Sequence, residues 1–576
     1  MTRRGRRPLS KPRDGRTDVS RSEPRTRNPE PETQTARNPY AAWIVLAAVA
    51  VVTLIVRLRL AGVPLERDEG EYAYAGQLIL HGYPPYALAY NMKFPGTYYA
   101  YALILAVFGP SPWGIHVGLI ILNLSTAAVI WRIGVRVIGS LAGALAAACF
   151  LILSLDRGVL GVFAHATHFV LLPALAGLFV LIRSRARRPG ATLAAGVLLG
   201  LAALMKQQGV FFLPLGVAIA ASDFSETNLV RHRVGRARRA GLVLAGAALP
   251  LAALCLVLLV QSVLGRFWFW TIDYARAYVG VVPLDRAWSI FATEWAHVAG
   301  HTMAIWVVAA AGGLTLWLTS WPPQCRFVLT GLAVAGLAAI TPGFYFREHY
   351  WILMLPAVSL CAGVAAAAAE RVLTRVWRAR GMAALIVSAS AAVIFVAYAA
   401  AQWTYCFVTT PVALSRELFG PNPFPEAAGI ARYIHDRTGP GGRIAVLGSE
   451  PEIYFYADRA SATGYIYMYP FMESQPFAAP MQREMTQEIV AARPAYLVLV
   501  SVPTSWSDGQ FSMPPILRWS QAYTKQCYDL VGIADIGESR TTMVWDRDAA
   551  MYQPASPNVI LTFKRRVPAP CGTPLN

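Results

Sequence analysis

The chain has 576 residues, of which 56% are hydrophobic and only 14% are charged. A chain this long and this apolar cannot be a single soluble domain and is typical of a multi-pass membrane protein. Its formal net charge of +19 does not indicate a nucleic-acid partner, because the arginines gather in short patches between apolar runs, as the orienting loops of membrane proteins do.

The N-terminal residues 1–39 are rich in Arg, Pro, Ser and Thr and have almost no large apolar side chains. Such a segment cannot bury enough surface to fold alone, so we predict a disordered cytoplasmic tail. It is not a signal peptide, because its basic region is too long and no small-residue cleavage pattern follows. Residues 40–60 then supply the roughly 20 apolar positions of a first span, which places residue 65 onward outside.

The remaining topology depends on whether the short apolar segment 97–108 crosses the membrane. If it does not cross, the basic loops 183–188, 231–239 and 371–380 all face the cytoplasm, as the positive-inside rule requires. We therefore predict an interfacial or re-entrant segment there. About eleven spans result, within a range of about nine to thirteen, and the fold class is a mainly α transmembrane bundle. The predicted spans are 41–60, 113–133, 141–155, 160–182, 191–205, 210–222, 240–264, 303–320, 327–341, 350–369 and 381–402.

The less apolar residues 403–576 are predicted to lie outside as a small α/β domain. The aliphatic runs 443–447 and 496–500 are typical of strands, and the segments 425–437 and 480–492 are typical of helices. This alternation favours a partly parallel sheet in a structural or acceptor-recognition module. The transmembrane domain would then comprise residues 40–402, with a first outer loop at 61–112. Cys527 and Cys571 could form a disulfide there, and the cysteine spacing gives no sign of a zinc site.

An unusual acidic stretch, Leu65-Glu66-Arg67-Asp68-Glu69-Gly70-Glu71-Tyr72-Ala73-Tyr74, follows the first span. The spacing of Asp68 and Glu71 predicts a capping box at the start of an amphipathic helix that ends near His81 and lies on the outer membrane surface. Capping leaves Glu66 and Glu69 unexplained. A carboxylate at this level could also be a general base, kept ionised by the neighbouring Arg67.

Downstream lies Tyr90-Asn91-Met92-Lys93-Phe94-Pro95-Gly96-Thr97-Tyr98-Tyr99, in which a lysine precedes a Pro-Gly break and a tyrosine-rich apolar run. The acidic pair, the following helix, this segment and the many later spans together resemble the membrane-embedded glycosyltransferases of the GT-C fold. The resemblance is closest to family 39 and its bacterial relatives, such as protein O-mannosyltransferases and the aminoarabinose transferase of lipid A. It covers about residues 41–360.

The resemblance implies transfer of a hexose or pentose from a polyprenyl-phosphate carrier to an acceptor on the outer face, usually with inversion. Asp68 matches the general base of the family, with Glu69 its catalytic neighbour. The departing phosphate needs stabilising cations, and Lys93 and Lys206 match lysines of the family. The candidate substrate-binding residues are Tyr72, Lys93, Lys206, Arg347, His349 and Tyr350.

Several of these residues also have ordinary structural explanations. Lys206 could be a snorkelling side chain at a helix end, and the group from Arg347 to Tyr350 could be an interfacial anchor. His165 and His168 fit buried core histidines, and Asp156 with Arg157 fits a local ion pair. No cofactor is indicated, although Asp68 and Glu69 with one histidine could hold a divalent metal.

The expected partners are a polyprenyl-phosphate sugar, the lipid bilayer, and a glycan, lipid or protein acceptor in the cell envelope. The expected location is the plasma (inner) membrane, with a cytoplasmic N-terminus and an extracytoplasmic C-terminal domain. Two other functions fit the sequence. One is a transporter or flippase of lipid-linked sugars, although transporters usually bury charges near the bilayer midplane. The other is an oligosaccharide ligase with a polyprenyl-diphosphate donor.

Overall fold

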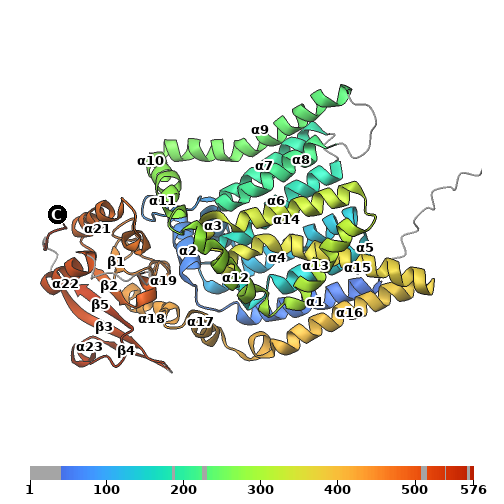
Figure 1. The fold of residues 1–576 in the computed structure, drawn as a ribbon. Helices are drawn as coiled ribbons and strands as arrows, with labels where there is room; N and C mark the ends of the chain where they lie inside the picture. The colour runs from blue at the N-terminus through green and yellow to red at the C-terminus, as the bar shows by residue number, and fades with distance from the viewer. Residues whose placement is uncertain are drawn as a thin grey trace, which may run out of the picture. The chain divides into compact units, whose positions relative to one another are not determined.

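A computed structural model describes residues 40–184, 188–222, 230–506, 515–538, 540–566 and 571–575, without the side chains of 230–234. The predicted disordered tail, 1–39, lies outside the described residues. The described residues, from Tyr40 onward, form one compact unit. This unit contains a helical part, which ends near residue 408, and a C-terminal region, residues 409–575, that carries the sheet (Figure 1).

The helical part confirms the predicted mainly α class, and its long helices run alongside one another (Figure 1). Its elements, with η for short 3-10 or π segments, are α1 (Tyr40–Leu60), α2 (Arg67–Leu80), α3 (Gly96–Phe108), α4 (Pro112–Val137), α5 (Ser140–Leu153), η1 (Arg157–Val159), α6 (Ala166–Ser184), α7 (Pro189–Met205), η2 (Gln207–Phe212), α8 (Leu213–Ala221), α9 (Val230–Val260), α10 (Leu264–Trp268), η3 (Phe269–Tyr274), α11 (Ala275–Val279), α12 (Leu284–Gly300), α13 (Met303–Leu318), α14 (Pro323–Ile340), η4 (Pro342–Phe344), η5 (Glu348–Met354), α15 (Leu355–Trp377), α16 (Arg380–Ala401) and η6 (Thr404–Val408).

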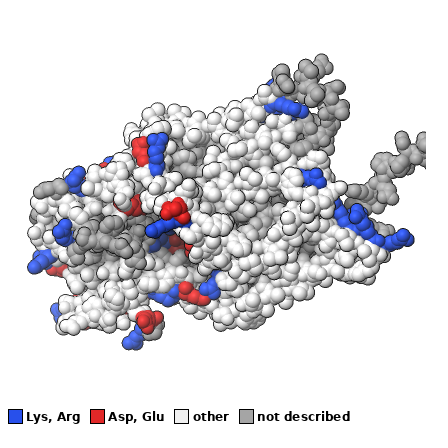
Figure 2. All heavy atoms as spheres, in the orientation of Figure 1, with Lys and Arg blue, Asp and Glu red and all other residues white. Residues whose placement is uncertain are grey.

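Among the described residues, 7 helices are long and apolar enough to cross a membrane, or 8 if the bent pair α12 and α13 counts as one span. These correspond to eight of the predicted spans. The other three predicted spans, 141–155, 191–205 and 210–222, form shorter apolar helices, and α3 is a short helix as well. On the face seen in Figure 2, charged side chains are nearly absent along the long helices, which is typical of a lipid-facing surface.

Helix α2 ends where the sequence predicts, but it begins two residues earlier, and its cap and its position differ from the prediction. Glu66, not Asp68, is the N-cap: its carboxylate accepts the backbone N–H groups of Asp68 and Glu69, and Glu69 completes the capping box. Glu71 therefore has no capping role. The helix is also not on the surface, because its residues from Glu69 to Leu78 are buried.

Two glycines explain how α2 is buried on two sides. A Cβ atom at Gly70 would lie 2.7 Å from the backbone nitrogen of Glu452, in the C-terminal region. A Cβ atom at Gly76 would lie 2.9 Å from the backbone nitrogen of Ala102, in α3. Because small residues let backbones approach closely, α2 packs between α3 and α19 (Glu452–Ala457) instead of lying on the membrane surface.

The C-terminal region contains a five-stranded sheet in the order β1-β2-β5-β3-β4, in which β1 and β2 are parallel and the other pairs are antiparallel. The predicted partly parallel sheet is thus confirmed, and so is the disulfide between Cys527 and Cys571. The elements are α17 (Pro411–Phe419), α18 (Phe424–His435), β1 (Ile444–Leu447), α19 (Glu452–Ala457), α20 (Tyr469–Met472), α21 (Ala478–Ala492), β2 (Tyr496–Ser501), η7 (Pro503–Ser505), α22 (Pro515–Cys527), β3 (Tyr528–Ile536), β4 (Thr541–Trp545), α23 (Arg547–Met551) and β5 (Val559–Arg565).

The C-terminal region packs directly on α2 through a shared apolar core. Tyr74 of α2 stacks on Tyr454 of α19, with ring centroids 5.1 Å apart, and its hydroxyl accepts the N–H of Ser461. Loops of the C-terminal region therefore reach the first turn of α2, where the acidic stretch lies.

Candidate active site

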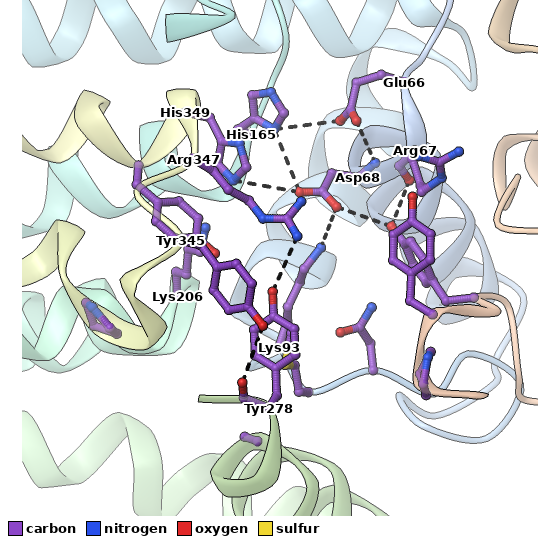
Figure 3. A pocket seen from close by; sticks show the side chains of 18 of the residues that line it. Glu66, Arg67, Asp68, Lys93, His165, Lys206, Tyr278, Tyr345, Arg347 and His349 are labelled. Atoms are coloured by element: carbon purple, nitrogen blue, oxygen red, sulfur yellow. Dashed lines mark hydrogen bonds and ion pairs between the residues drawn. The ribbon is translucent and has the colours of Figure 1, made fainter. Parts of the chain in front are cut away.

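A cavity of about 720 Å³ opens beside the first turn of α2 (Figure 3). Its walls come from distant parts of the chain: the acidic stretch, the loop before α3, the segment around Lys206, the segments η3 and α11, the segment before α15, and the C-terminal region. Of the predicted site residues, the cavity is lined by Asp68, Lys93, Lys206, Arg347, His349 and Tyr350.

Asp68 and Lys93 form an ion pair at the centre of this cavity. The Lys93 ammonium lies 2.9 Å from Oδ1 of Asp68 and 2.7 Å from Oε2 of Glu71. Glu71 is fully buried and also accepts a hydrogen bond from the Tyr98 hydroxyl at 2.5 Å. Tyr72 does not line the cavity; its ring lies below Lys93, 4.6 Å from the ammonium.

The cation that pairs with Asp68 is Lys93, and the prediction that Arg67 plays this part is wrong. Arg67 turns toward the C-terminal region, where it pairs with Glu450 at 3.1 Å and donates to the carbonyl of Ser449 at 2.5 Å. Consecutive residues on a helix point about 100° apart, so Arg67 and Asp68 face different neighbours.

The two carboxyl groups that share Lys93 differ in their acidity. Burial raises the pKa of Asp68, but Lys93, His349 and His165 together outweigh that effect, so the pKa of Asp68 lies well below its usual range. Burial raises the pKa of Glu71, and Lys93 does not fully offset that effect. The Asp68 side chain is 23% exposed and lines the cavity, in contrast to the fully buried Glu71.

His165 and His349 face the other oxygen of Asp68 (Figure 3). Their rings stack with centroids 4.2 Å apart, and Nδ1 of His165 and Nε2 of His349 each lie 3.9 Å from Oδ2 of Asp68. Among the described residues, neither ring nitrogen of His165 has a hydrogen-bond partner. One donor atom from each of the three side chains lies within 4.8 Å of the others, a group that could hold a metal ion.

Glu69 lies apart from this group, although the sequence predicts it as a second catalytic and metal-binding carboxylate. It is fully buried and does not line the cavity. Its Oε1 lies 2.9 Å from Nε2 of His116 and accepts the N–H of Ala164 at 2.5 Å. Asp68 and Glu69 are adjacent on a helix and therefore point to different sides. In place of Glu69, His165 is the second candidate metal ligand beside Asp68.

A cationic and aromatic wall faces Asp68 across the cavity. The Lys206 ammonium lies 4.1 Å from the ring centroid of Tyr350. Arg347 lies over the ring of Tyr345, and Tyr345 stacks on Tyr278 with centroids 4.8 Å apart. Burial lowers the pKa of Lys206 to about 7, so its charge depends on pH near neutrality.

Two other histidine and ion-pair predictions have different outcomes. His168 is a core residue, as its apolar surroundings predict, and its Nδ1 lies 3.1 Å from Oδ1 of Asn123. The predicted local pair of Asp156 with Arg157 is wrong. Arg157 pairs with Glu417 at 2.6 Å, whereas Asp156 accepts a hydrogen bond from Tyr398.

Sequence reasoning missed the cavity residues of the C-terminal region. Tyr467, Tyr469 and Glu473 all line the cavity, and the Tyr467 hydroxyl lies 3.2 Å from Oδ1 of Asp68. The only available signal was a cluster of tyrosines at 465–469 between the predicted elements, and it does not say which part of the chain these tyrosines contact.

Comparisons with known proteins agree with this architecture. Residues 92–249 match the family model described as dolichyl-phosphate-mannose-protein mannosyltransferase. A crystal structure of ArnT from Cupriavidus metallidurans bound to undecaprenyl phosphate has a TM-score of 0.53 and 18% identity, covering 87% of this chain and 97% of that one. The apo form of ArnT has a TM-score of 0.52 and 16% identity, covering 89% and 98%.

The archaeal oligosaccharyltransferase AglB from Archaeoglobus fulgidus, in complex with an inhibitory peptide and a dolichol-phosphate, has a TM-score of 0.50 and 13% identity, covering 88% of this chain and 74% of AglB. No curated protein sequence matches the chain. The predicted resemblance to the GT-C membrane glycosyltransferases is confirmed, and the chain has their fold.

Proposed function

We propose that this protein is an integral membrane glycosyltransferase that moves a sugar from a polyprenyl-phosphate carrier to an acceptor. The observation that carries the proposal is the cavity at the first turn of α2, where the carboxylate of Asp68 faces the cationic side chains of Lys206 and Arg347. Transfer from a sugar phosphate needs both features: a base for the attacking hydroxyl and positive charge for the departing phosphate.

Asp68 is the general base. Its Oδ1 is occupied by Lys93, and its Oδ2 faces the cavity, where the acceptor hydroxyl can deliver its proton. A carboxylate held by a lysine is a weak base, so we expect a bound phosphate to draw Lys93 away and raise the basicity of Asp68. The neighbouring Glu66, Glu69 and Glu71 are engaged with other partners, and this supports direct displacement with inversion by a single base.

The carrier phosphate binds between Lys93, Lys206 and Arg347. Lys206 and Arg347 are separate in sequence but line the same cavity, and each lies over a tyrosine ring. Lys206 is buried, whereas Arg347 is exposed. Fixed positive charge in a partly enclosed site stabilises the phosphate as it departs with the bonding electrons. The carrier phosphate needs no proton donor as it leaves, because it is the weakly basic anion of a comparatively strong acid.

Asp68, His165 and His349 would hold a divalent cation, and the missing hydrogen-bond partners of His165 support this assignment. The ion would bind Oδ2 of Asp68, the oxygen that faces both histidines, so metal binding and proton acceptance by that oxygen are alternatives. Two imidazoles and one carboxylate suit Zn²⁺ or Mn²⁺ better than Mg²⁺, which prefers oxygen ligands. Such an ion would add positive charge beside the departing phosphate.

An apolar groove of about 440 Å³ offers a place for the polyprenyl tail. It is lined by residues of η2, α8, α13 and α14, from Arg326 to Ala338 along α14 and from Phe211 to Ala218 along η2 and α8. The same two stretches of chain line the main cavity, through Gln207 and Gln208 on one and through Pro342 on the other. The polyprenyl tail of a carrier with its phosphate in the cavity could therefore extend into the apolar groove.

The orientation of the chain follows from charge and redox chemistry. The disulfide between Cys527 and Cys571 favours an extracytoplasmic C-terminal region, because such bonds persist in oxidising compartments. On the face seen in Figure 2, the charged side chains at the end remote from the sheet are Lys or Arg, as expected for the cytoplasmic side. The cavity then opens at the outer face, where C-terminal loops line it, and this favours an enzyme over a transporter with a midplane site.

The proposal is tested with purified protein in lipid vesicles and a panel of radiolabelled polyprenyl-phosphate sugars. We expect acceptor-dependent release of the carrier from one of them, and no release by the Asp68→Asn variant. A panel member with a diphosphate-linked oligosaccharide distinguishes an oligosaccharide ligase. Movement of intact donor across the vesicle membrane, without cleavage by any acceptor extract, would instead support a flippase.

A further inference from the structure

We propose that Tyr467, in the C-terminal region, is a positioning residue for Asp68 and sets which carboxylate oxygen faces the acceptor. This inference rests on the proposed function of Asp68 as general base. The Tyr467 hydroxyl lies 3.2 Å from Oδ1 of Asp68 and 3.0 Å from the carbonyl oxygen of Arg67. One hydroxyl proton can be donated to either acceptor, so the ring is fixed beside the backbone and the side chain of the same helical turn.

The two oxygens of Asp68 have different surroundings because of this contact. Oδ1 has both Lys93 and Tyr467 within hydrogen-bond distance, whereas Oδ2 lies toward His165 and His349, each 3.9 Å away. Rotation of an aspartate carboxylate about its last torsion is only weakly restricted. Donors concentrated on one oxygen therefore decide which oxygen remains for the attacking hydroxyl.

Lys93 alone cannot fix the carboxylate in this way. Its ammonium is also shared with Glu71, at 2.7 Å, and it ends a flexible side chain of four methylene groups. If a bound phosphate attracts Lys93, the lysine no longer holds Oδ1. Tyr467 carries a rigid ring, is only 8% exposed and does not depend on the carrier, so it keeps its place throughout the reaction.

The segment that carries Tyr467 is anchored on both sides of the cavity. The N–H of Met468 donates to Ser449 at 2.9 Å. The carbonyl of Gly464 accepts the N–H of Tyr90 at 2.7 Å, from the loop that leads to Lys93. Gly464 is required there, because a Cβ atom would overlap the Tyr90 ring. The C-terminal region thus links the Lys93 loop to Asp68 and completes the catalytic cavity. This role goes beyond the structural or acceptor-recognition role that the sequence predicts for the region.

The first test compares Tyr467→Phe with Tyr456→Phe in the full-length protein in lipid. Tyr456 is a matched control: its hydroxyl also joins the C-terminal region to the segment before α2, by accepting the N–H of Leu65 at 3.0 Å, but it does not line the cavity. We expect Tyr467→Phe to lower kcat by about 10- to 100-fold, the effect of one hydrogen bond to a charged group, with little change in KM for the donor. Tyr456→Phe should keep the kcat of the unmodified protein.

A normal kcat in Tyr467→Phe, or an equal loss in both variants, would overturn the positioning role. An increase in KM for the donor with unchanged kcat would also contradict it, because that pattern belongs to a residue that only binds the carrier. If the unmodified protein transfers no sugar at all, the proposed function fails, and a second measurement still decides whether Tyr467 contacts Asp68.

That second measurement needs no donor. With 3-fluorotyrosine placed at position 467, the ¹⁹F resonance reports the hydrogen bond of its hydroxyl. We expect the resonance to move when Asp68→Asn is introduced, whereas 3-fluorotyrosine at position 456 should give the same resonance in both backgrounds. A resonance at position 467 that does not respond to Asp68→Asn would refute the contact on which the proposal depends.

Discussion

The paired carboxylates on Lys93 allow a direct test of whether Asp68 does chemistry or only neutralises a lysine. Asp68→Asn and Glu71→Gln each remove one carboxylate from the same ammonium, at 2.9 and 2.7 Å, and in each variant Lys93 keeps the other. Each variant should therefore lose one charged hydrogen bond, about 1.5–3 kcal/mol of stability at most. Glu71 is the more deeply buried of the two, so Glu71→Gln should have the lower melting temperature.

In activity the two variants should have the opposite order, with Asp68→Asn the more impaired. Loss of a general base lowers kcat by about 10²–10⁴-fold, or about 3–5.5 kcal/mol of transition-state stabilisation, so Asp68→Asn should be nearly inactive. Glu71→Gln should lose about tenfold or less. Glu71 does not line the cavity, so its carboxylate cannot reach the acceptor hydroxyl.

The assay is acceptor-dependent release of the carrier at saturating donor, with thermal unfolding of the same preparations as the measure of stability. Equal losses of kcat in the two variants would refute the reasoning, because Asp68 would then act only as a partner of Lys93. So would near-normal turnover by Asp68→Asn.

Three further predictions follow from the cavity, the groove and the disulfide. Lys206 has a pKa of about 7 and is charged below that pH, so KM for the donor should rise as pH increases through 7. Lys206→Arg stays protonated and should give a KM that does not change with pH. If KM of that variant rises with pH as in the unmodified protein, Lys206 is not part of the carrier site. Ala338→Trp should obstruct the apolar groove and raise KM for long polyprenyl carriers but not for a short-chain analogue. Leu337→Trp, outside the groove, should change KM for neither carrier. Equal effects of the two variants would contradict binding of the tail in the groove. Cys527→Ser should lower stability by about 4 kcal/mol, the chain-entropy value for a sequence separation of 44, and a reducing agent should lower the melting temperature of the unmodified protein but not of the variant.

Much of the fold follows from local sequence patterns. The long apolar runs predict the spanning helices because their length matches the bilayer core, and the aliphatic runs at 443–447 and 496–500 predict β1 and β2. Three short apolar runs were harder to interpret, since hydropathy alone does not distinguish a complete span from a shorter buried helix.

The choice of cap shows where local pattern stops being sufficient. Glu66 with Glu69 and Asp68 with Glu71 have the same spacing, so the sequence offers two capping boxes for one helix. The structure uses Glu66, because Lys93 comes from another loop and pairs with Asp68 and Glu71. The sequence likewise cannot choose between Arg67 and Lys93 as the cation of Asp68, since that choice depends on Glu450.

By itself the sequence determined the long apolar helices and the helical turn that carries Asp68, because both depend on segment length or on residues close together in the chain. Only the tertiary structure brought His165 and His349 into contact and placed Tyr467 beside Asp68, 399 residues away. Contacts over such distances depend on how helices and loops pack together, and here the close approach of α2 to α3 and α19 at two glycines decides that packing.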